Sequence, residues 1–502
     1  MAKRQNCAVR QALQNPLILQ QIFKNGSVSG KKVRLVCHLW NEIVLSHPQP
    51  KLTLFLHTDP SRGDSSSEDE YDDDGRLKGP CSFNPLQLFC VKMEPRLARC
   101  IKEYQCISKG QVAPWQKLCA IESRVIHVTN KFNLFLEHVT INFYSEHLIP
   151  TLYEILKTCC PNLKRLEICF EFTGFGHSLD DNSYGTSPLC IRPMLTFIKI
   201  LDLTVHTGFF KMTQLVLNSA PNLTHFTYHG DKFPDLSRNV SIKMITFGWR
   251  STRLLRCNGL KKMLDQVKDQ LEFLHVKSNG TGSTVLIDVR LPKMKRLKEF
   301  RNEVLDCFSC GDQLQDIYTE RMPCLERLLI FTIEQNLTEL LRTISRQSRI
   351  LFSGVKHLHV PRIDDPEVIV GLKMSFPKLE SLTIDQRNLE PQIIELGSNL
   401  RACTSLGLKY LKLFLLDPCD KLSEVIRDLS TLKELFPSLK TLEIEFHSYK
   451  KRVTDDLDLI VDGTEKMKQW FLAMKGLENI KQERRKWVQF FIQENRIPIV
   501  LE

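Results

Sequence analysis

A short pattern of apolar residues that recurs along the chain constrains its fold more than any other feature. Five copies share one form, in which a proline is followed two residues later by an apolar residue, with further apolar residues three and five positions on. These copies span residues 160–168, 220–228, 322–330, 376–384 and 436–444. The last two apolar positions are separated by one residue, so both point to the same face of a short strand. The sequence therefore predicts one strand with one buried face in each copy.

Weaker copies lie between these five and keep the spacing without the proline. They are Leu136/Val139/Ile141, Ile198/Leu201/Leu203, Leu271/Leu274/Val276, Val355/Leu358/Val360 and Leu408/Leu411/Leu413. A further copy at Met294/Leu297 is degraded, because Glu299 takes its third apolar position. Successive copies start 23 to 35 residues apart, with one interval of 48. This spacing resembles that of leucine-rich repeats, where each turn of a solenoid contributes one strand.

We therefore predict an α/β leucine-rich-repeat solenoid over residues 81–460, with a parallel strand wall and helices on the convex side. Residues 148–158 illustrate the helices, because their apolar residues follow helical spacing. Irregular insertions are expected at 171–192, 230–258 and 278–284. Residues 51–57 alternate in polarity and predict a strand.

The two ends of the predicted solenoid differ from its middle. The stretch that follows residue 81 is expected to be partly helical, with apolar marks at Leu97, Ile101 and Tyr104. Residues 461–502 predict a helical cap, in which an apolar stripe runs from Met467 to Ile480. A helix that binds a partner is the alternative for this last segment.

Charge is distributed unevenly along the chain. The net charge is +11, yet residues 59–76 hold eight acids and two bases, so the rest of the chain carries +17. We expect residues 59–80 to form an acidic disordered loop, because like charges repel and little in the segment can be buried. The basic excess allows a nucleic-acid-binding solenoid as an alternative. No basic cluster is interleaved with aromatic residues, so we expect a diffuse positive surface instead.

Residues 10–48 predict short helices that precede the repeats. Residues 15–23 hold a proline, apolar residues and an Ile-Phe pair, and residues 34–43 hold Val-Cys followed two residues later by Trp. This sequence pattern resembles an F-box, although the proline lies one residue closer to Ile-Phe than in the commonest form. Residues 27–32 also lack the usual Asp-Leu pair. A helical cap on the first repeat is the alternative.

An F-box ahead of leucine-rich repeats resembles the substrate receptors of cullin-based ubiquitin ligases. The resemblance implies docking on the small adaptor subunit of an SCF-type ligase together with its cullin. It also implies that the repeats hold a protein substrate for ubiquitin-dependent catabolism. The residues to which the adaptor-binding role is transferred are Pro16, Leu19, Ile22, Phe23, Val36, Cys37 and Trp40. The alternative is a leucine-rich-repeat scaffold for protein interactions without a link to ubiquitin.

The repeats also predict which residues meet the target. Residues between the inward strand positions project from the concave wall, and their mixed charges and aromatic rings suit a protein surface. The predicted target-binding row comprises Glu167, His229, His275, Lys277, His359, Asp385, Lys412 and Glu443.

No catalytic motif is found, so we expect a binding protein and no enzyme, without a cofactor. Cys307 and Cys310 form a lone CxxC, which is half of a zinc site, and no metal is expected. The chain has no apolar run that could span a bilayer and no apolar N-terminal signal. We therefore expect a cytoplasmic or nuclear protein whose cysteines stay reduced.

Overall fold

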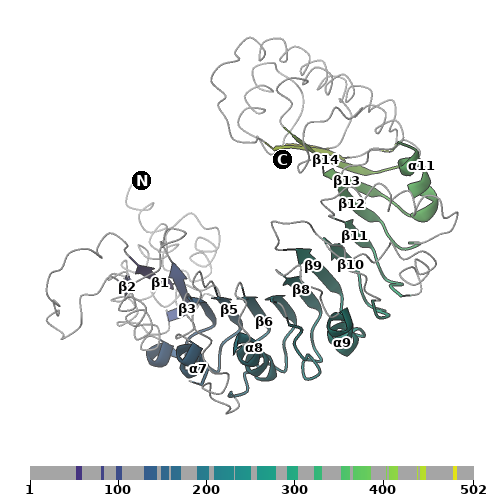
Figure 1. Ribbon diagram of the computed structural model, residues 1–502. Helices are drawn as coiled ribbons and strands as arrows, with labels where there is room; N and C mark the ends of the chain where they lie inside the picture. The colour runs from purple at the N-terminus through teal and green to yellow at the C-terminus, as the bar shows by residue number, and fades with distance from the viewer. Residues whose placement is uncertain are drawn as a thin grey trace, which may run out of the picture. The chain divides into compact units, whose positions relative to one another are not determined.

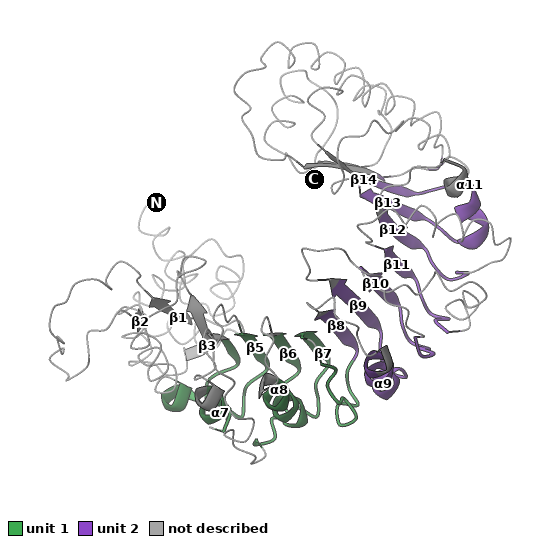
Figure 2. Cartoon of the chain, in the orientation of Figure 1, with its two compact units in different colours: residues 1–242 green, residues 243–502 purple. Residues whose placement is uncertain are grey.

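The computed structural model divides the chain into two compact units, residues 1–242 (unit 1) and 243–502 (unit 2), coloured separately in Figure 2. It describes residues 52–58, 81–83, 98–104, 129–143, 149–157, 160–170, 189–202, 208–230, 232–249, 257–278, 291–303, 321–330, 352–361, 366–385, 403, 406–416, 438, 441–447 and 479–482. No helix within these ranges is long and apolar enough to cross a membrane.

Unit 1 is built on strands that follow one another in the sheet almost in chain order. The order is β2-β1-β3-β4-β5-β6-β7, and every pairing is parallel except that of β1 with β2. The bounds are β1 Leu52–Thr58, β2 Cys81–Phe83, β3 Ala98–Tyr104, β4 His138–Phe143, β5 Arg165–Phe170, β6 Phe197–Asp202 and β7 His225–His229. The strand predicted at residues 51–57 is therefore present as β1.

Unit 2 repeats this arrangement with parallel strands in strict chain order from β8 to β16. The bounds are β8 Met244–Trp249, β9 Phe273–Ser278, β10 Glu299–Asn302, β11 Arg327–Ile330, β12 His357–Pro361, β13 Ser381–Asp385, β14 Tyr410–Leu416, β15 Thr441–His447 and β16 Asn479–Gln482. Each strand is only a few residues long, as expected when one repeat contributes one strand.

Helices in the connections complete the core. They are α7 Ile149–Lys157 and α8 Gly208–Asn218 in unit 1, and α9 Cys257–Val267 and α11 Pro366–Ser375 in unit 2. In unit 1, α7 and α8 lie next to each other on one side of the strands (Figure 1). The predicted helix at residues 148–158 is thus confirmed as α7, which buries Leu152, Ile155 and Leu156. The described parts of the chain form an α/β repeat fold with parallel strands.

The buried residues correct the predicted phase of two repeats. The inward residues of this repeat are Leu195, just before β6, and Ile198 and Ile200 within it, each at most 1% exposed, so the pattern starts three residues earlier than predicted. Both faces of β6 carry apolar residues, and only its register with β5 decides which face is inward. The copy predicted at Met294 and Leu297 instead starts three residues later. Its buried residues are Leu297, Phe300 and Asn302.

An additional repeat fills the 48-residue interval. Ile242, Ile245 and Phe247 are fully buried and have the same spacing as the other copies, in the stretch that was expected to be an irregular insertion. That expectation was wrong for β8. Its apolar pattern is short and lies among polar and basic residues, so it does not stand out in the sequence. With these corrections, the first buried residues of successive repeats from Leu136 to Leu408 are 19 to 32 residues apart.

Two further predictions differ from the structure at the ends of the sheet. Ile101 and Tyr104 were expected to mark helical structure, but both lie in β3, which pairs with β1 and β4, and Leu97 lies outside the described residues. Ile480 was expected on a helical stripe, but it lies in β16. Pairing of β16 with β15 satisfies backbone groups along the edge of β15, a gain that local helical spacing does not reveal.

At many of the described strands, the residue before the strand joins neighbouring repeats through its carbonyl group. The carbonyl of Glu137 accepts hydrogen bonds from the amides of Lys164 and Arg165, at 2.8 and 3.0 Å. The same two-donor arrangement recurs in both units, for example at Lys356, which accepts from Glu380 and Ser381. Side chains at this position are therefore held one strand apart along the sheet.

In unit 2 these side chains alternate in charge. This charge ladder comprises Lys243, Glu272, Lys298, Glu326, Lys356, Glu380 and Lys409. Four steps of the ladder are ion pairs, Lys243–Glu272 at 3.7 Å, Glu272–Lys298 at 2.8 Å, Glu326–Lys356 at 3.4 Å and Glu380–Lys409 at 3.0 Å. The hydrogen bond from Lys298 is the largest cause that lowers the pKa of Glu272. Alternation favours this order of repeats, since a slipped repeat would bring like charges together.

Charge reversal in the ladder should destabilise unit 2 in a salt-dependent way. We expect Glu272→Lys to lower the melting temperature, because two attractions become repulsions from Lys243 and Lys298. Exposed charges are screened, so the loss should shrink at about 1 M salt, where the Debye length is about 3 Å. Thermal unfolding at low and high salt measures this. Glu154→Lys is the matched control, because Glu154 lies in α7 of unit 1, outside the ladder, and is also paired with a lysine, Lys157. Equal losses at both salt concentrations would contradict the prediction.

Candidate functional site

The strands present one face to the core and the opposite face, here called the outer face, away from it. In β5 the burial alternates, with Leu166, Ile168 and Phe170 buried and the residues between them accessible. Strand register then aligns equivalent outer residues into rows across each unit. The central row of unit 1 runs through Lys102, Thr140, Glu167, Lys199 and Thr227. The central row of unit 2 runs through Thr246, His275, Arg301, Leu329, His359, Thr383, Lys412, Glu443 and Lys481.

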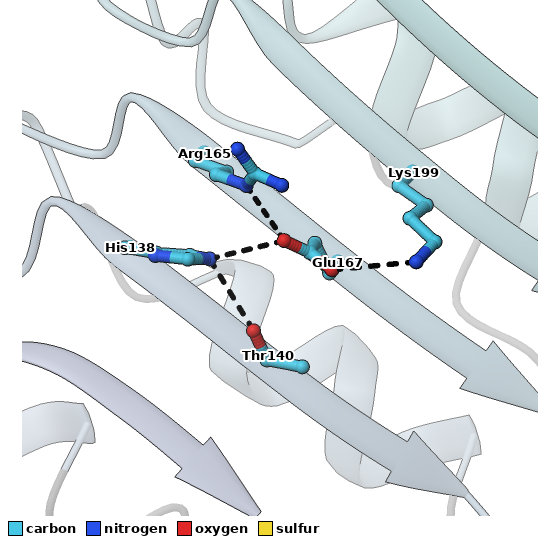
Figure 3. Close-up of polar contacts among 5 residues, drawn as sticks. All are labelled: His138, Thr140, Arg165, Glu167 and Lys199. Atoms are coloured by element: carbon cyan, nitrogen blue, oxygen red, sulfur yellow. Dashed lines mark hydrogen bonds and ion pairs between the residues drawn. The ribbon is translucent and has the colours of Figure 1, made fainter. Parts of the chain in front are cut away.

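Glu167 is the centre of a polar cluster on the outer face of unit 1 (Figure 3). Its Oε1 accepts a hydrogen bond from Arg165 Nε at 2.6 Å and lies 3.3 Å from His138 Nε2. Lys199 Nζ lies 3.7 Å from Oε2, and Thr140 Oγ1 lies 3.3 Å from the same nitrogen of His138. Three neighbouring strands, β4, β5 and β6, thus place their side chains around one carboxylate.

The surroundings of Glu167 stabilise its ionised form. The pKa of Glu167 is lowered to about 2, chiefly by the hydrogen bond with His138, then by the hydrogen bond and the charge of Arg165 and by the charge of Lys199. Partial burial opposes these effects. Glu167 is therefore a carboxylate at neutral pH that holds basic side chains, and it is unsuited to act as a general acid there.

The lowered pKa predicts how Glu167 contributes to stability with pH. A carboxylate whose folded-state pKa is depressed stabilises the fold above its unfolded pKa, and the contribution is lost as the pH falls through the folded pKa. We expect wild type to unfold at a higher temperature than Glu167→Gln above about pH 4.5. The difference should shrink as the pH falls towards 2. Thermal unfolding of both proteins across this range is the measurement, and a constant difference would contradict the ionic role.

A stack of planar side chains lies beside the cluster, one strand apart in each step. The guanidinium carbon of Arg165 lies 3.8 Å from the ring centroid of Phe197. Phe197 in turn stacks with His225, at 6.2 Å between centroids, and Thr224 Oγ1 lies 2.7 Å from His225 Nδ1. Such cation–π and ring contacts keep Arg165 extended over the sheet.

The outer face of unit 2 carries a similar set in which acids balance bases. Arg301 Nε donates to Glu299 at 2.7 Å, and Arg327 lies 3.7 Å from the same carboxylate. His275 Nε2 lies 2.8 Å from Glu303, and Arg301 lies over the ring of Phe273 at 5.2 Å. Further along the sheet, burial lowers the pKa of His357, which favours its neutral form.

The predicted target-binding residues are distributed over two rows. Glu167 occupies the central row of unit 1, and His275, His359, Lys412 and Glu443 occupy the central row of unit 2. The remaining three, His229, Lys277 and Asp385, lie two residues further along their strands. His229 and Asp385 are only 8% and 7% exposed, so they offer a partner less surface than the prediction assumed.

The structure adds functional candidates that the sequence analysis did not name. Arg165, Phe197 and Lys199 complete the Glu167 cluster, and Arg301 holds the equivalent central position in unit 2. The corrected phase of β6 would have placed Lys199 between two inward residues, which is the signal that could have found it. The partners of Arg165 and Phe197 depend on strand register and could not be read from spacing.

Several predicted sites lie outside the described residues. These are the adaptor-binding residues of the N-terminal segment, the acidic loop at 59–80 and the CxxC at Cys307 and Cys310. Within the described ranges, no group of three or more His, Cys, Asp or Glu side chains is arranged to hold a metal ion. Burial raises the pKa of Cys403 to about 12, so this thiol is not an activated nucleophile.

A scan of protein-family models finds no match to this chain, and a search of curated proteins also finds none. Its class is therefore defined by the fold: an α/β repeat protein with parallel strands. The outer face of each unit carries clustered basic, acidic and aromatic side chains.

Proposed function

We propose that this chain is a leucine-rich-repeat substrate receptor of an SCF-type ubiquitin ligase, with an F-box-like segment at residues 10–48. The observation that carries the proposal is the pair of outer faces, where strand register aligns accessible polar and aromatic side chains into rows. A wall of this kind offers a large recognition area without catalytic groups. The F-box part rests on sequence resemblance.

The proposed mechanism is tethering. Apolar helix packing through Ile22, Phe23 and Trp40 would hold the adaptor subunit, while the repeats hold a protein substrate. The ligase core would then act on a substrate whose effective concentration is set by the complex and not by diffusion. The chain itself supplies no chemistry in this mechanism.

Co-purification from cell extract tests this function directly. The full chain and a version without residues 1–48 are compared by mass spectrometry of the proteins that remain bound. We expect the adaptor and cullin with the full chain only, and substrates with both versions. Because truncation could expose the first repeat, Ile22→Asp in the full chain is a second variant, and its melting temperature should stay near that of wild type.

Two results would contradict the proposal. If neither version retains the adaptor, the chain is a binding scaffold without a link to ubiquitin. If Ile22→Asp unfolds the repeats, residues 10–48 are a structural cap on the solenoid and not a docking segment.

A further inference from the structure

The outer faces of the two units differ in how their charges are compensated. Among the described side chains of β4 to β7, Glu167 is the one carboxylate on the outer face of unit 1, and it is shared by Arg165 and Lys199. In unit 2, Arg301 and Arg327 share the carboxylate of Glu299, and the neighbouring Glu303 pairs with His275. The Glu167 cluster therefore has two permanent cations for one carboxylate.

The positive groups of the cluster are also its accessible ones. The side chains of Arg165 and Lys199 are 44% and 37% exposed, whereas that of Glu167 is 17% exposed. A partner that binds this face would therefore contact Arg165 and Lys199 more readily than Glu167. Arg165 uses its Nε for Glu167, and its terminal nitrogens make no hydrogen bond with the other residues drawn in Figure 3. This end of the guanidinium has the geometry to donate two hydrogen bonds to one carboxylate.

We propose that the outer face of β4–β6 binds an acidic segment of a protein partner, with Arg165 and Lys199 paired to its Asp or Glu side chains. Phe197 adds an accessible aromatic surface that keeps the Arg165 plane in position. Glu167 is a positioning residue for Arg165, because it accepts the hydrogen bond from Arg165 Nε while its own side chain is only 17% exposed. This inference rests on the proposed function in that it names the chemistry of a substrate held by the repeats.

Charge complementarity favours an acidic protein segment over a nucleic acid. Along the central row, the described side chains next to Glu167 and Lys199 are Thr140 and Thr227, so the positive excess covers about two strands among the described side chains. A nucleic acid places a phosphate on every nucleotide and needs a longer basic groove. The carboxylate of Glu167 within the cluster would also repel a dense row of phosphates.

Peptide selection against the full chain tests the proposal. A random peptide library is selected on wild type, on Arg165→Gln/Lys199→Gln and on Lys157→Gln, a control that removes an exposed lysine from helix α7. Wild type and the control should enrich peptides rich in Asp and Glu. The best such peptide should bind the double variant about tenfold or more weakly, the size expected when exposed charge-assisted hydrogen bonds are lost. Its affinity for wild type should fall with salt.

Glu167→Gln distinguishes an effect of charge on peptide affinity from an effect of altered folding, because it should raise the affinity that the double variant lowers. Glutamine can still accept the hydrogen bond from Arg165, while the repulsion from the carboxylate is gone, so acidic peptides should bind more tightly. A loss of affinity as large as that of the double variant would show that the cluster acts through local structure, and would overturn the proposal. Enrichment of peptides that are not acidic, or equal binding to the double variant, would overturn it as well.

The outcomes also separate this inference from the proposed function. If no peptide of any composition is enriched, protein recognition by the repeats fails together with the inference. If peptides are enriched but are not acidic, protein recognition stands and only the inference falls. If single-stranded oligonucleotides displace the peptides and bind more tightly than they do, the face is a nucleic-acid site and the proposal is wrong. Removal of residues 1–48 should not change the selection.

Discussion

Replacing Phe247 by alanine will lower the free energy of unfolding by about 3–5 kcal/mol, the range measured for large aromatic side chains in closely packed cores. Phe247 is fully buried in β8, within the stretch that the sequence analysis assigned to an irregular insertion. Truncation removes its contacts and leaves a cavity that the short strand cannot close. The expected loss is therefore large only if this stretch is a true repeat.

Hydrogen exchange of the β8 amides together with urea denaturation measures this effect, because repeat proteins can unfold locally and not in one step. Val240→Ala is the matched control from the same stretch. Val240 is 71% exposed, and its truncation should change the free energy of unfolding by no more than about 0.5 kcal/mol. If Phe247→Ala were as mild as the control, residues 244–249 would not belong to the packed sheet.

The second large effect should come from Asn239, which lies fully buried after α8 and β7. Its side-chain amide donates to the carbonyls of Leu217 and Ala220, at 3.0 and 2.8 Å, and so gives each a second donor beside its backbone hydrogen bond at the end of α8. Asn239→Ala removes both side-chain hydrogen bonds, although each carbonyl keeps a backbone donor, Leu217 from Ala220 N and Ala220 from Leu223 N. We expect a loss of about 1–3 kcal/mol, because each buried hydrogen bond contributes about 0.5–1.5 kcal/mol net.

A second asparagine provides the comparison. Asn222 donates to the carbonyl of Pro193 at 3.0 Å in an exposed position, where water can replace it. Asn222→Ala should therefore cost about 1 kcal/mol or less. Denaturation of the two variants side by side is the measurement, and equal losses would mean that the burial of Asn239 does not determine its effect.

Much of the fold was predictable because one rule repeats. The two inward residues of a strand are two positions apart, and a leading apolar residue lies three positions before the first of them. Leu163, Leu166 and Ile168 follow this rule, and all three are buried. The rule failed where a strand is apolar on both faces, as in β6, and where an inward position is polar, as at Asn302. In both cases the neighbouring strands decide the phase.

The candidate site was less predictable than the fold. Spacing alone placed Glu167, His275 and His359 between inward residues, and the register of the strands agrees with that placement. Spacing could not show that Glu167 would gather basic side chains from residues roughly thirty positions away in either direction. It also could not show that His229 and Asp385 would be almost covered by their neighbours.

The sequence by itself determined that short strands recur with one buried face, because burying apolar side chains at fixed spacing requires it. Only the tertiary structure decided which strand lies beside which, and in what register. That register brings Lys199 to Glu167 and alternates the charges from Lys243 to Lys409. Interactions across strands depend on distances of a few ångströms between residues far apart in the chain, and no local pattern contains that information.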